Sequence, residues 1–389
     1  MTIKYGICEA SAVAFIGLGM VLNNPLNDYS SAMRCANIAQ RIMDLTHGGQ
    51  LGGLVDMGAN EYIFRFSLST KEVDRFAQKA YHRSMQAGNF ELGLTMLQCQ
   101  FAVFYFQDST LHDLRKRIGH ALQQSRIYRV ASMDGVSHSY LRLAQSLSGI
   151  ETVDWSKIHS QSTRDLTQHP PEPSQQLELK LECFASACVA YYGERHEDAY
   201  RLAKLFRSIG DKNETFILVC DRFYMTGLTA SAMYRKTKKR MYRRKLRAQL
   251  TTLQDLVQKK GDGLRLCKLL LEAEDRSLSD TKGDPRLIHK VLGAYEAAIQ
   301  VALEESSMQM IALGYELAAE HLIRSKEQAR ANHRRNNGDA RYPNGVVSDD
   351  TIKQYLEQAL KHYHAWGCLL KVDLIRQSRP RYVKSWHPT

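Results

Sequence analysis

Three adjacent polar residues are the first place where this sequence could do chemistry. His196, Glu197 and Asp198 stand together in "GERHEDAY", and histidine beside carboxylates suggests a metal site. A zinc-binding helix needs a second histidine four residues after the first, but position 200 is Tyr200. The stretch is therefore interpreted as a turn followed by acidic residues at the start of a helix.

The other titratable residues do not form a catalytic set. Glu272 and Glu274 are two positions apart in "LLLEAEDR", so on a helix they point in different directions and cannot act as an acid–base pair. His321, His362 and His364 lie on or beside apolar stripes, where packing accounts for them. The sequence contains no phosphate loop and no kinase catalytic loop, and no Ser or Cys has an identifiable base. We expect no enzymatic activity and no cofactor.

Eight cysteines are scattered through the chain, and no two form a C-x-x-C pair. They are Cys8, Cys35, Cys99, Cys183, Cys188, Cys220, Cys267 and Cys368. Zinc sites built from cysteine use such short spacings, so we expect no metal site. Most of the cysteines lie in apolar helical patterns, which indicates reduced, buried thiols and a cytoplasmic location.

One basic run stands out. The stretch "YRKTKKRMYRRKLRAQL", residues 234–250, carries nine Lys or Arg and no acid. On a single helix its apolar residues and those that follow form one stripe, made of Tyr242, Leu246, Leu250, Leu253 and Val257. Arginines at positions 240, 243, 244 and 247 then lie on the opposite, solvated side.

The start of this run does not fit the same helix. Arg235, Lys238 and Lys239 would fall in line with the apolar stripe, so the helix either overhangs its neighbours there or begins nearer Arg240. An overhanging basic tip could bind an acidic protein, anionic lipid or nucleic acid. The possible contact residues are Arg235, Lys238, Lys239, Arg240, Arg243, Arg244 and Arg247. A nuclear import signal also needs a basic cluster of this size.

Charge and composition limit these alternatives. The formal net charge is +12, and the nine bases of this run account for all but +3 of it. The rest of the surface carries nearly equal positive and negative charge, which disfavours a protein that binds nucleic acid over its whole surface. With 389 residues, 44% hydrophobic and 24% charged, the chain is of globular type. The apolar stretch "ASAVAFIGLGMVL" is too short to span a bilayer, so we expect a soluble protein.

Apolar spacings of three and four predict helices along most of the chain. The predicted helices are 11–22, 28–45, 72–87, 90–106, 111–128, 137–147, 177–192, 197–209 and 215–227. Further on, Asp284 and Pro285 read as a helix cap followed by the first helical position. Three long helical stripes follow, and the last of them runs from Ile352 to Leu370. Since no strict alternation is found, the sequence predicts an all-α protein.

Two polar segments divide the chain. Residues 150–173, ending "TQHPPEPS", read as a linker, and residues 326–348 read as a mobile loop. The predicted map is a helical block at 1–149, the linker, a second block at 174–378 that contains the loop, and a tail at 379–389. Short helix hairpins cannot bury their apolar faces alone, so they must stack. We therefore predict a degenerate, tetratricopeptide-like α-solenoid of stacked antiparallel helix hairpins.

Four segments carry a family resemblance. They are "GICEASAVAFIGLGMVL" with "DYSSAMRCANIAQRIMDL", "GDGLRLCKLLLEAEDRSL", "DPRLIHKVLGAYEAAIQVALEESSMQMIALGYELAAEHLIRS" and "YLEQALKHYHAWGCLLKVDLIRQ". In this order they resemble the helical-repeat segment behind the AAA-type ATPase module of large multidomain signalling proteins. Those proteins commonly also contain a serine/threonine kinase-like domain, a GAF domain and a histidine kinase. The resemblance extends from about Tyr5 to Ile375.

The resemblance implies a non-catalytic, protein-contacting scaffold of signal transduction, either free-standing or cut from a larger protein. The sequence departs from the full family pattern, because it has no phosphate loop and no histidine kinase block after Trp386. The segment 326–348 also looks longer than its counterpart in the family. Protein partners are therefore expected, with nucleic-acid binding through residues 235–247 as the alternative.

Overall fold

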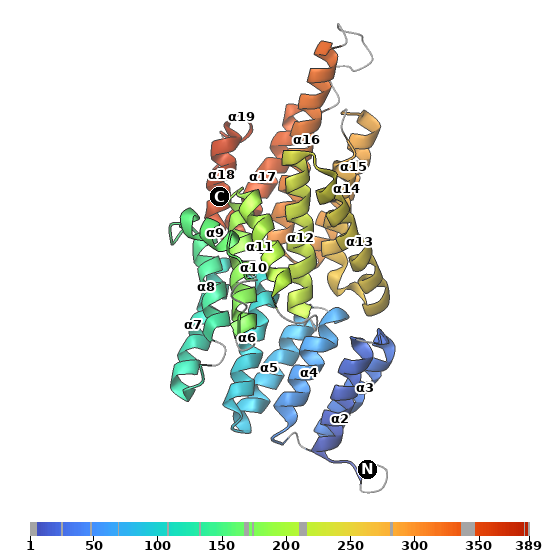
Figure 1. Cartoon of the computed structure of the whole chain (residues 1–389), viewed down its shortest axis with the longest axis vertical. Helices are drawn as coiled ribbons and strands as arrows, with labels where there is room; N and C mark the ends of the chain where they lie inside the picture. Colours follow the sequence, from blue (N-terminus) through green and yellow to red (C-terminus); the bar gives the residue numbers. More distant parts are fainter. Residues whose placement is uncertain are drawn as a thin grey trace.

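The structure is a computed structural model that describes most of the chain. The residues outside the description are 1–5, 25, 47–48, 69, 107–108, 132–133, 167–170, 173–174, 210–215, 281–282, 336–346, 385 and 388–389, together with the side chains of 70–71, 216–223 and 333–335. Within the described residues every regular element is a helix and there is no strand (Figure 1). The all-α prediction is confirmed.

The first half of the molecule is a succession of helices, most of them packed on their neighbours in sequence. They are α2 (Glu9–Asn23), α3 (Tyr29–Leu45), α4 (Gly52–Tyr62), η1 (Phe64–Phe66), α5 (Thr70–Gln86), α6 (Phe90–Phe106), α7 (Leu111–Tyr128), α8 (Asp134–Leu147) and α9 (Trp155–Ser162). The buried faces follow the predicted spacing. On α3 the buried residues include Ala32, Cys35, Ala36, Ala39, Ile42 and Met43.

The second half continues the same arrangement. Its helices are α10 (Gln176–Tyr192), α11 (His196–Ser208), α12 (Phe216–Thr237), α13 (Arg240–Lys260), η3 (Asp262–Leu264), α14 (Arg265–Ser277), α15 (Pro285–Glu304), α16 (Met308–Arg335), α17 (Asp349–Trp366), α18 (Leu369–Ser378) and α19 (Pro380–Val383). As predicted, the side chain of Asp284 caps α15 by accepting a hydrogen bond from the backbone N–H of Arg286. Consecutive helices from α10 to α17 pack on one another, so the chain is an α-solenoid.

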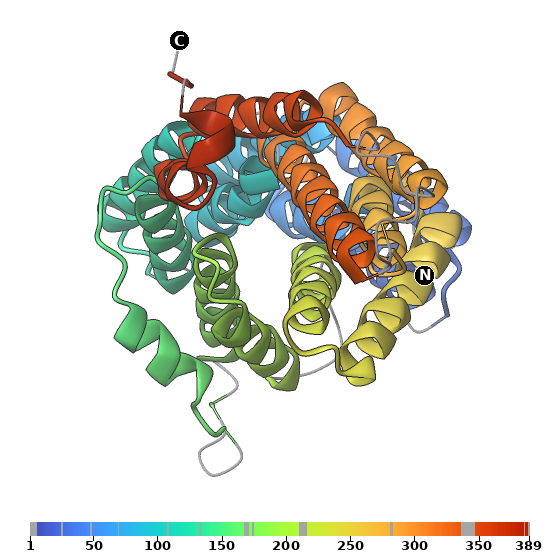
Figure 2. The ribbon, with the colours of Figure 1, turned by 90° about the horizontal axis from the view of Figure 1, so that it is seen from above.

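The solenoid closes on itself. Seen along its long axis, the last helices return beside α8 and α10 (Figure 2). The Ser307 hydroxyl, just before α16, donates to the Phe106 carbonyl at the end of α6, at 2.5 Å. Trp366 of α17 is fully buried, and its ring centroid lies 5.7 Å from that of Tyr105 and 5.8 Å from that of Tyr192. These contacts join residues between 174 and 261 positions apart and hold the turn of the solenoid closed.

Some helices lie where none was predicted, among them α4 and α9. Residues 52–62 form α4 although they include three glycines, because the helix packs closely on its neighbours: a Cβ at Gly58 would collide with Ile16 of α2. Inside the predicted linker, residues 155–162 form α9, capped by Asp154, whose carboxylate accepts from the N–H groups of Ser156 and Lys157. The linker is therefore helical in part, and the division into two blocks stays a prediction.

The prediction of a mobile loop was wrong for residues 326–335. Helix α16 continues through residues 326–335, a stretch rich in good helix formers, and Lys326 pairs with Asp349 at the start of α17 at 3.0 Å. Residues 336–346 of the predicted loop lie outside the described residues. The final predicted helix is also two helices, because Gly367 adopts a left-handed φ of 89° and ends α17.

Candidate functional site

The basic run is divided between two helices at Lys238. Helix α12 ends at Thr237 and α13 begins at Arg240, with Lys238 in the left-handed region at a φ of 57°. The second sequence alternative, a helix that begins nearer Arg240, is therefore the observed one. Downstream, the predicted stripe faces the core: Leu246, Leu250 and Leu253 are buried.

Arg235 points into the protein and not toward solvent. Its guanidinium donates two hydrogen bonds to the carboxylate of Glu274 on α14, at 2.7 and 2.8 Å, and a third to Ser277. Glu274 is fully buried and also accepts from the hydroxyls of Ser231 and Tyr295, both at 2.5 Å. This cluster ties α12, α14 and α15 together, so Arg235 is not an exposed contact residue.

The electrostatics of the cluster favour the ion pair. Burial by itself would raise the pKa of Glu274, but the charge and hydrogen bonds of Arg235, with those of Ser231 and Tyr295, lower that pKa to about 2. The carboxylate in turn raises the pKa of the Arg235 guanidinium, against the effect of burial. Both groups are therefore charged at neutral pH and hold each other in place.

Other bases of the run are also paired inside the chain. Arg243 and Arg247 share the carboxylate of Asp275 on α14, at 3.2 and 3.1 Å. Lys236 lies 3.6 Å from a carboxylate oxygen of Glu197 on α11. Three exposed cations, Lys239, Arg240 and Arg244, make no ion pair with any described residue, and Lys238 faces the Tyr234 ring at 5.9 Å.

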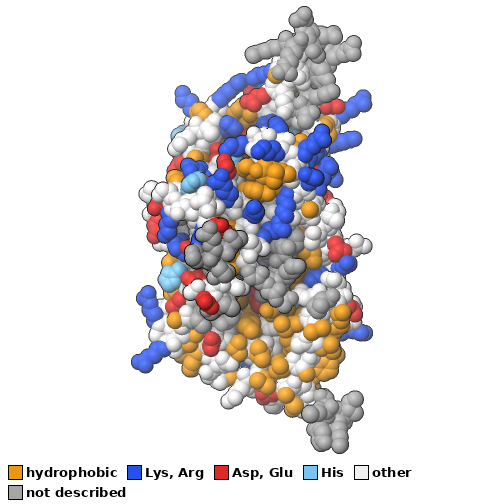
Figure 3. All heavy atoms as spheres, in the orientation of Figure 1, with side chains coloured by type: hydrophobic (Ala, Val, Ile, Leu, Met, Phe, Trp, Pro, Cys, Tyr) orange, Lys and Arg blue, Asp and Glu red, His pale blue; other side chains and the backbone are white. Residues whose placement is uncertain are grey.

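Apolar and aromatic side chains lie among these cations. Met241 is 52% exposed, and the ring of Tyr242 stands edge-on to that of Tyr200 of α11, with centroids 5.0 Å apart. The Arg243 guanidinium lies 6.0 Å from the Tyr234 ring. Figure 3 shows a hydrophobic area surrounded by Lys and Arg in the upper part of the face drawn there. We call Lys238, Lys239, Arg240, Met241 and Arg244 the basic tip.

A second buried ion-pair cluster lies where the solenoid closes. The Lys371 ammonium of α18 contacts the carboxylates of Glu316 on α16, at 2.7 Å, and of Glu194 before α11, at 3.0 Å. The hydroxyl of Tyr363 donates to the other oxygen of Glu316 at 2.6 Å. Burial alone would lower the pKa of Lys371, but the two carboxylates raise it, so the lysine stays charged. No sequence pattern marked this cluster, because its members lie far apart in the chain.

A Ser–His–Asp grouping is present but lacks the geometry of a nucleophile and its base. Asp198 accepts a hydrogen bond from the Ser162 hydroxyl at 2.9 Å and also contacts Nδ1 of His159 at 2.8 Å. Burial would raise the pKa of Asp198, but these bonds lower it. Since the serine donates to the carboxylate and not to the imidazole, the base cannot take its proton. The grouping instead fastens α9 to α11.

The histidines singled out in the sequence are packing residues. His321 is 2% exposed, and burial lowers its pKa to about 4. His362 stacks on Tyr315 with ring centroids 6.0 Å apart, and His364 is edge-on to Trp386. His196 lies in the first turn of α11, and burial likewise lowers its pKa to about 4. The predicted helix start at this stretch, with Glu197 and Asp198 in the first turn, is confirmed.

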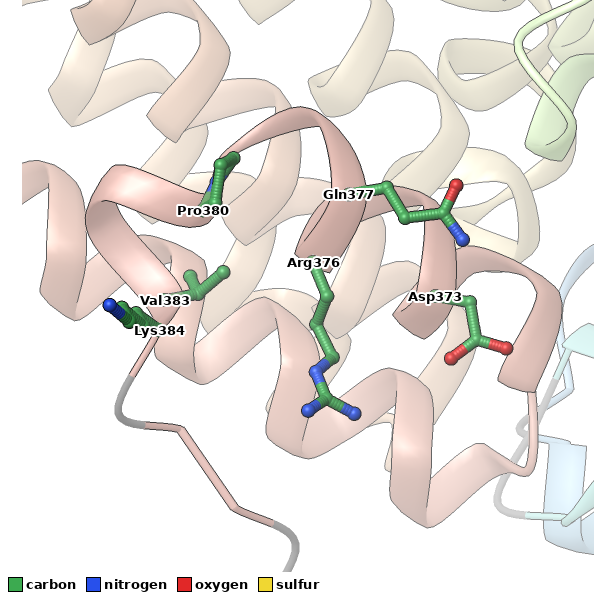
Figure 4. Close-up of a pocket in the computed structure, with 6 residues that line it drawn as sticks. All are labelled: Asp373, Arg376, Gln377, Pro380, Val383 and Lys384. Carbon is green, nitrogen blue, oxygen red and sulfur yellow. The ribbon is translucent and has the colours of Figure 1, made fainter.

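Two shallow hollows on the described surface are the first to consider as ligand sites. One, of about 390 Å³, lies between α18 and α19, and its charged side chains spread apart without converging on one point (Figure 4). The other, of about 160 Å³, lies among α8, α9 and α10. Neither brings together a nucleophile, a base and a pair of hydrogen-bond donors in the way that catalysis requires.

The described residues contain neither a candidate metal site nor a membrane-spanning helix. There, no group of three or more His, Cys, Asp or Glu side chains could hold a metal ion. No described helix combines the length and the apolarity needed to cross a membrane. Seven cysteines are free thiols, of which Cys8 is exposed, Cys99 half-buried and the rest buried; Cys220 lies among the side chains outside the description.

Comparisons with known proteins add little to this description. No family model matches the chain, and no curated protein matches it. Among solved structures, a circular tandem repeat protein with novel repeat topology and enhanced subunit contact surfaces aligns with 96% of this chain and 100% of its own, at 11% identity and a TM-score of 0.25. So low a score carries no argument about function, and the resemblance to the signalling-protein segment stays a prediction.

Proposed function

We propose that this chain is a non-catalytic scaffold that binds protein partners and serves a signal-transduction ATPase or kinase. It would act as the middle segment of such a protein or as a stand-alone relative. The ordered resemblance of four segments supports the signalling role. The solenoid supports the scaffold role, because the buried charged groups Glu274 and Lys371 form ion pairs between helices.

The basic tip is the feature of the structure that best supports binding to a protein partner. Most cations of the run have partners inside the chain, yet Lys239, Arg240 and Arg244 are exposed and form no ion pair within the described part. Met241 is exposed among them. An apolar contact residue with a charged rim is the usual composition of a protein interface, in which Met and Arg are enriched. The surface therefore suits an acidic protein segment that carries an apolar side chain.

The size of the basic tip argues against duplex DNA. Proteins that bind duplex DNA commonly make 6 to 10 phosphate contacts. Of the nine bases in the run, Arg235, Lys236, Arg243 and Arg247 pair inside the chain and Lys245 also has a partner. Three unpaired cations and Lys238 remain. A short acidic segment needs fewer contacts. Nucleic-acid binding stays the alternative, since Tyr234 and Tyr242 could stack on bases.

The test measures binding of a labelled acidic peptide containing leucine, by fluorescence anisotropy. We expect the double change Lys239→Glu with Arg240→Glu to weaken binding at least about tenfold, since both charges are reversed at the contact. The matched control reverses two exposed bases on α7, Lys116→Glu with Arg126→Glu, and should change the affinity less than about threefold. Equal losses in both variants would show a net-charge effect and contradict the assignment of the tip.

Two further measurements separate the other functions. Nanomolar affinity for single-stranded or duplex DNA in about 150 mM salt, with clear preference over competitor DNA, would favour nucleic-acid binding over the scaffold function. Calorimetry with ATP should show affinity no better than millimolar, since no phosphate cradle is present in the sequence. Micromolar binding that depends on magnesium would overturn the non-catalytic assignment.

A further inference from the structure

Exposed hydrophobic side chains concentrate at one end of the solenoid. Of fourteen large hydrophobic side chains exposed in the described part of the chain, eight lie within the first 54 residues: Ile7, Leu18, Val21, Leu26, Ile38, Leu45, Leu51 and Leu54. Figure 3 shows hydrophobic side chains gathered over α2, α3 and α4, in the lower part of the molecule. Terminal helices of a solenoid need a polar outer face, and large exposed apolar patches mark interaction sites.

The outer face of α2 is the centre of this patch. Its exposed residues are Ala10, Ala14, Gly17, Leu18 and Val21, spaced so that they form one stripe. A Cβ built on Gly17 would meet nothing within 4 Å, so the stripe is open to another backbone. The stripe has no charged or hydrogen-bonding side chain, and burying it would leave no polar group without a partner.

The stripe is complementary to a second copy of itself. Its N-terminal half carries small residues, Ala10 and Ala14, and its C-terminal half carries the larger Leu18 and Val21. In an antiparallel pair about a two-fold axis, Val21 of one copy faces Ala10 of the other, and Leu18 faces Ala14. A two-fold interface uses the same patch on both subunits and therefore requires such self-complementarity.

We propose that this chain forms a homodimer in which the α2 helices of two copies pack antiparallel. The available area is consistent with this. Helix α2 is about 22 Å long, and with α3 beside it the face is about 20 Å wide, so two copies offer roughly 900 Å² before corrugation is counted. A specific interface needs about 1,000 Å². Lipid fits the centre of the face less well, because α2 contains no Lys or Arg, which membrane-surface helices carry on their polar side, and the exposed Arg34 and Arg41 belong to α3.

Light scattering and sedimentation of the full chain test the dimer. From about 1 to about 100 µM, the wild type should reach twice the 44.4 kDa of one chain. Leu18→Lys, at a position 49% exposed, should stay monomeric over that range with an unchanged far-ultraviolet dichroism spectrum. The control Ile127→Lys, at a position 59% exposed at the far end of α7, should dimerise like the wild type. A monomeric wild type, or a dimer that survives Leu18→Lys, overturns the proposal.

Cross-linking tests the antiparallel register without relying on a disruptive substitution. The background carries Cys8→Ser, which removes the exposed thiol and keeps a capping residue before α2. Ala14→Cys and Gly17→Cys chains, mixed and mildly oxidised, should form a covalent dimer in much higher yield than either chain alone. Equal yields in all three samples would contradict the register. A wild type that stays monomeric yet floats with anionic vesicles would assign the face to lipid and also overturn the proposal.

Discussion

Glu274→Gln tests whether the buried cluster at the basic run holds the second half of the solenoid together. Glutamine keeps the shape of glutamate but removes its charge, so the Arg235 guanidinium, only 17% exposed, loses its counterion. The amide nitrogen would also replace an oxygen that now accepts hydrogen bonds from Arg235, Ser231 or Tyr295. Both effects destabilise the folded state and leave the unfolded state almost unchanged.

The loss of unfolding free energy in Glu274→Gln follows from two separate values. Removing one partner of a buried ion pair costs about 3–5 kcal/mol, because the other charge stays buried without compensation. Independently, the pKa of Glu274 falls from its ordinary 4.5 to about 2 in the folded protein. A pKa difference of about 2.5 corresponds to about 3 kcal/mol of unfolding free energy. The two values agree, so we expect Glu274→Gln to lose about 3 kcal/mol or more at pH 7.

The pH dependence follows from the sign of that shift. Since the pKa of Glu274 is lower in the folded than in the unfolded state, its stabilisation is complete above about pH 4.5 and is lost as the pH falls toward about 2. Urea unfolding followed by far-ultraviolet dichroism at several pH values measures this. The wild type should lose more stability than Glu274→Gln between pH 5 and the lowest pH at which it stays folded.

Glu272→Gln is the matched control for this experiment. It lies on the same helix, but its side chain is 20% exposed, and among the described residues its polar partners are Gln254 and Lys268, at 3.3 and 3.4 Å. Its loss should stay within about 0.5 kcal/mol. A Glu274→Gln variant that loses less than about 1 kcal/mol, or no more than this control, would refute the argument that the pair stabilises the fold.

Urea unfolding also checks three other expectations. Leu253→Ala should cost about 2–5 kcal/mol, because the side chain is fully buried on the inward face of α13. Arg244→Gln should stay within about 0.5 kcal/mol, whereas Arg243→Gln with Arg247→Gln should cost about 1 kcal/mol, because they release the carboxylate they share. Trp366→Ala should cost about 3–5 kcal/mol, since it empties the contact that closes the solenoid. A loss below about 1 kcal/mol at Trp366 would contradict that account of closure.

The helices that the sequence predicted best are those with strong local signals. The predicted ranges 90–106 and 111–128 coincide with α6 and α7, and the side chain of Thr110 caps α7 by accepting from the N–H of Asp113. The pair Asp284 and Pro285 likewise marked the start of α15. In these places the apolar period, the capping residue and the turn all agree, and tertiary contacts do not override them.

Helices without such signals depend on contacts that a local pattern does not contain. Helix α4 has glycines at positions 52, 53 and 58, which lower helix propensity but allow close packing on α2 and α5. Helix α9 is short, and Asp198 holds it from another helix 36 residues away. Residues 326–335 resemble a loop because they are polar, although most of them are good helix formers, and Lys326 also fastens them to α17. Each of these depends on a partner far away in the sequence.

The basic run shows the same contrast, since local signals predict part of it and long-range contacts decide the rest. A helical period assigned Arg240, Arg243, Arg244 and Arg247 to the outer face. Arg240, Arg244 and Arg247 are exposed, whereas Arg243 is only 23% exposed and pairs with Asp275. Periodicity could not identify Glu274 as the partner of Arg235, since the two lie 39 residues apart. The left-handed turn at Lys238 separates a base that stabilises the core from bases that remain exposed. Because that turn fixes which cations stay at the surface, it also sets the size of the basic tip.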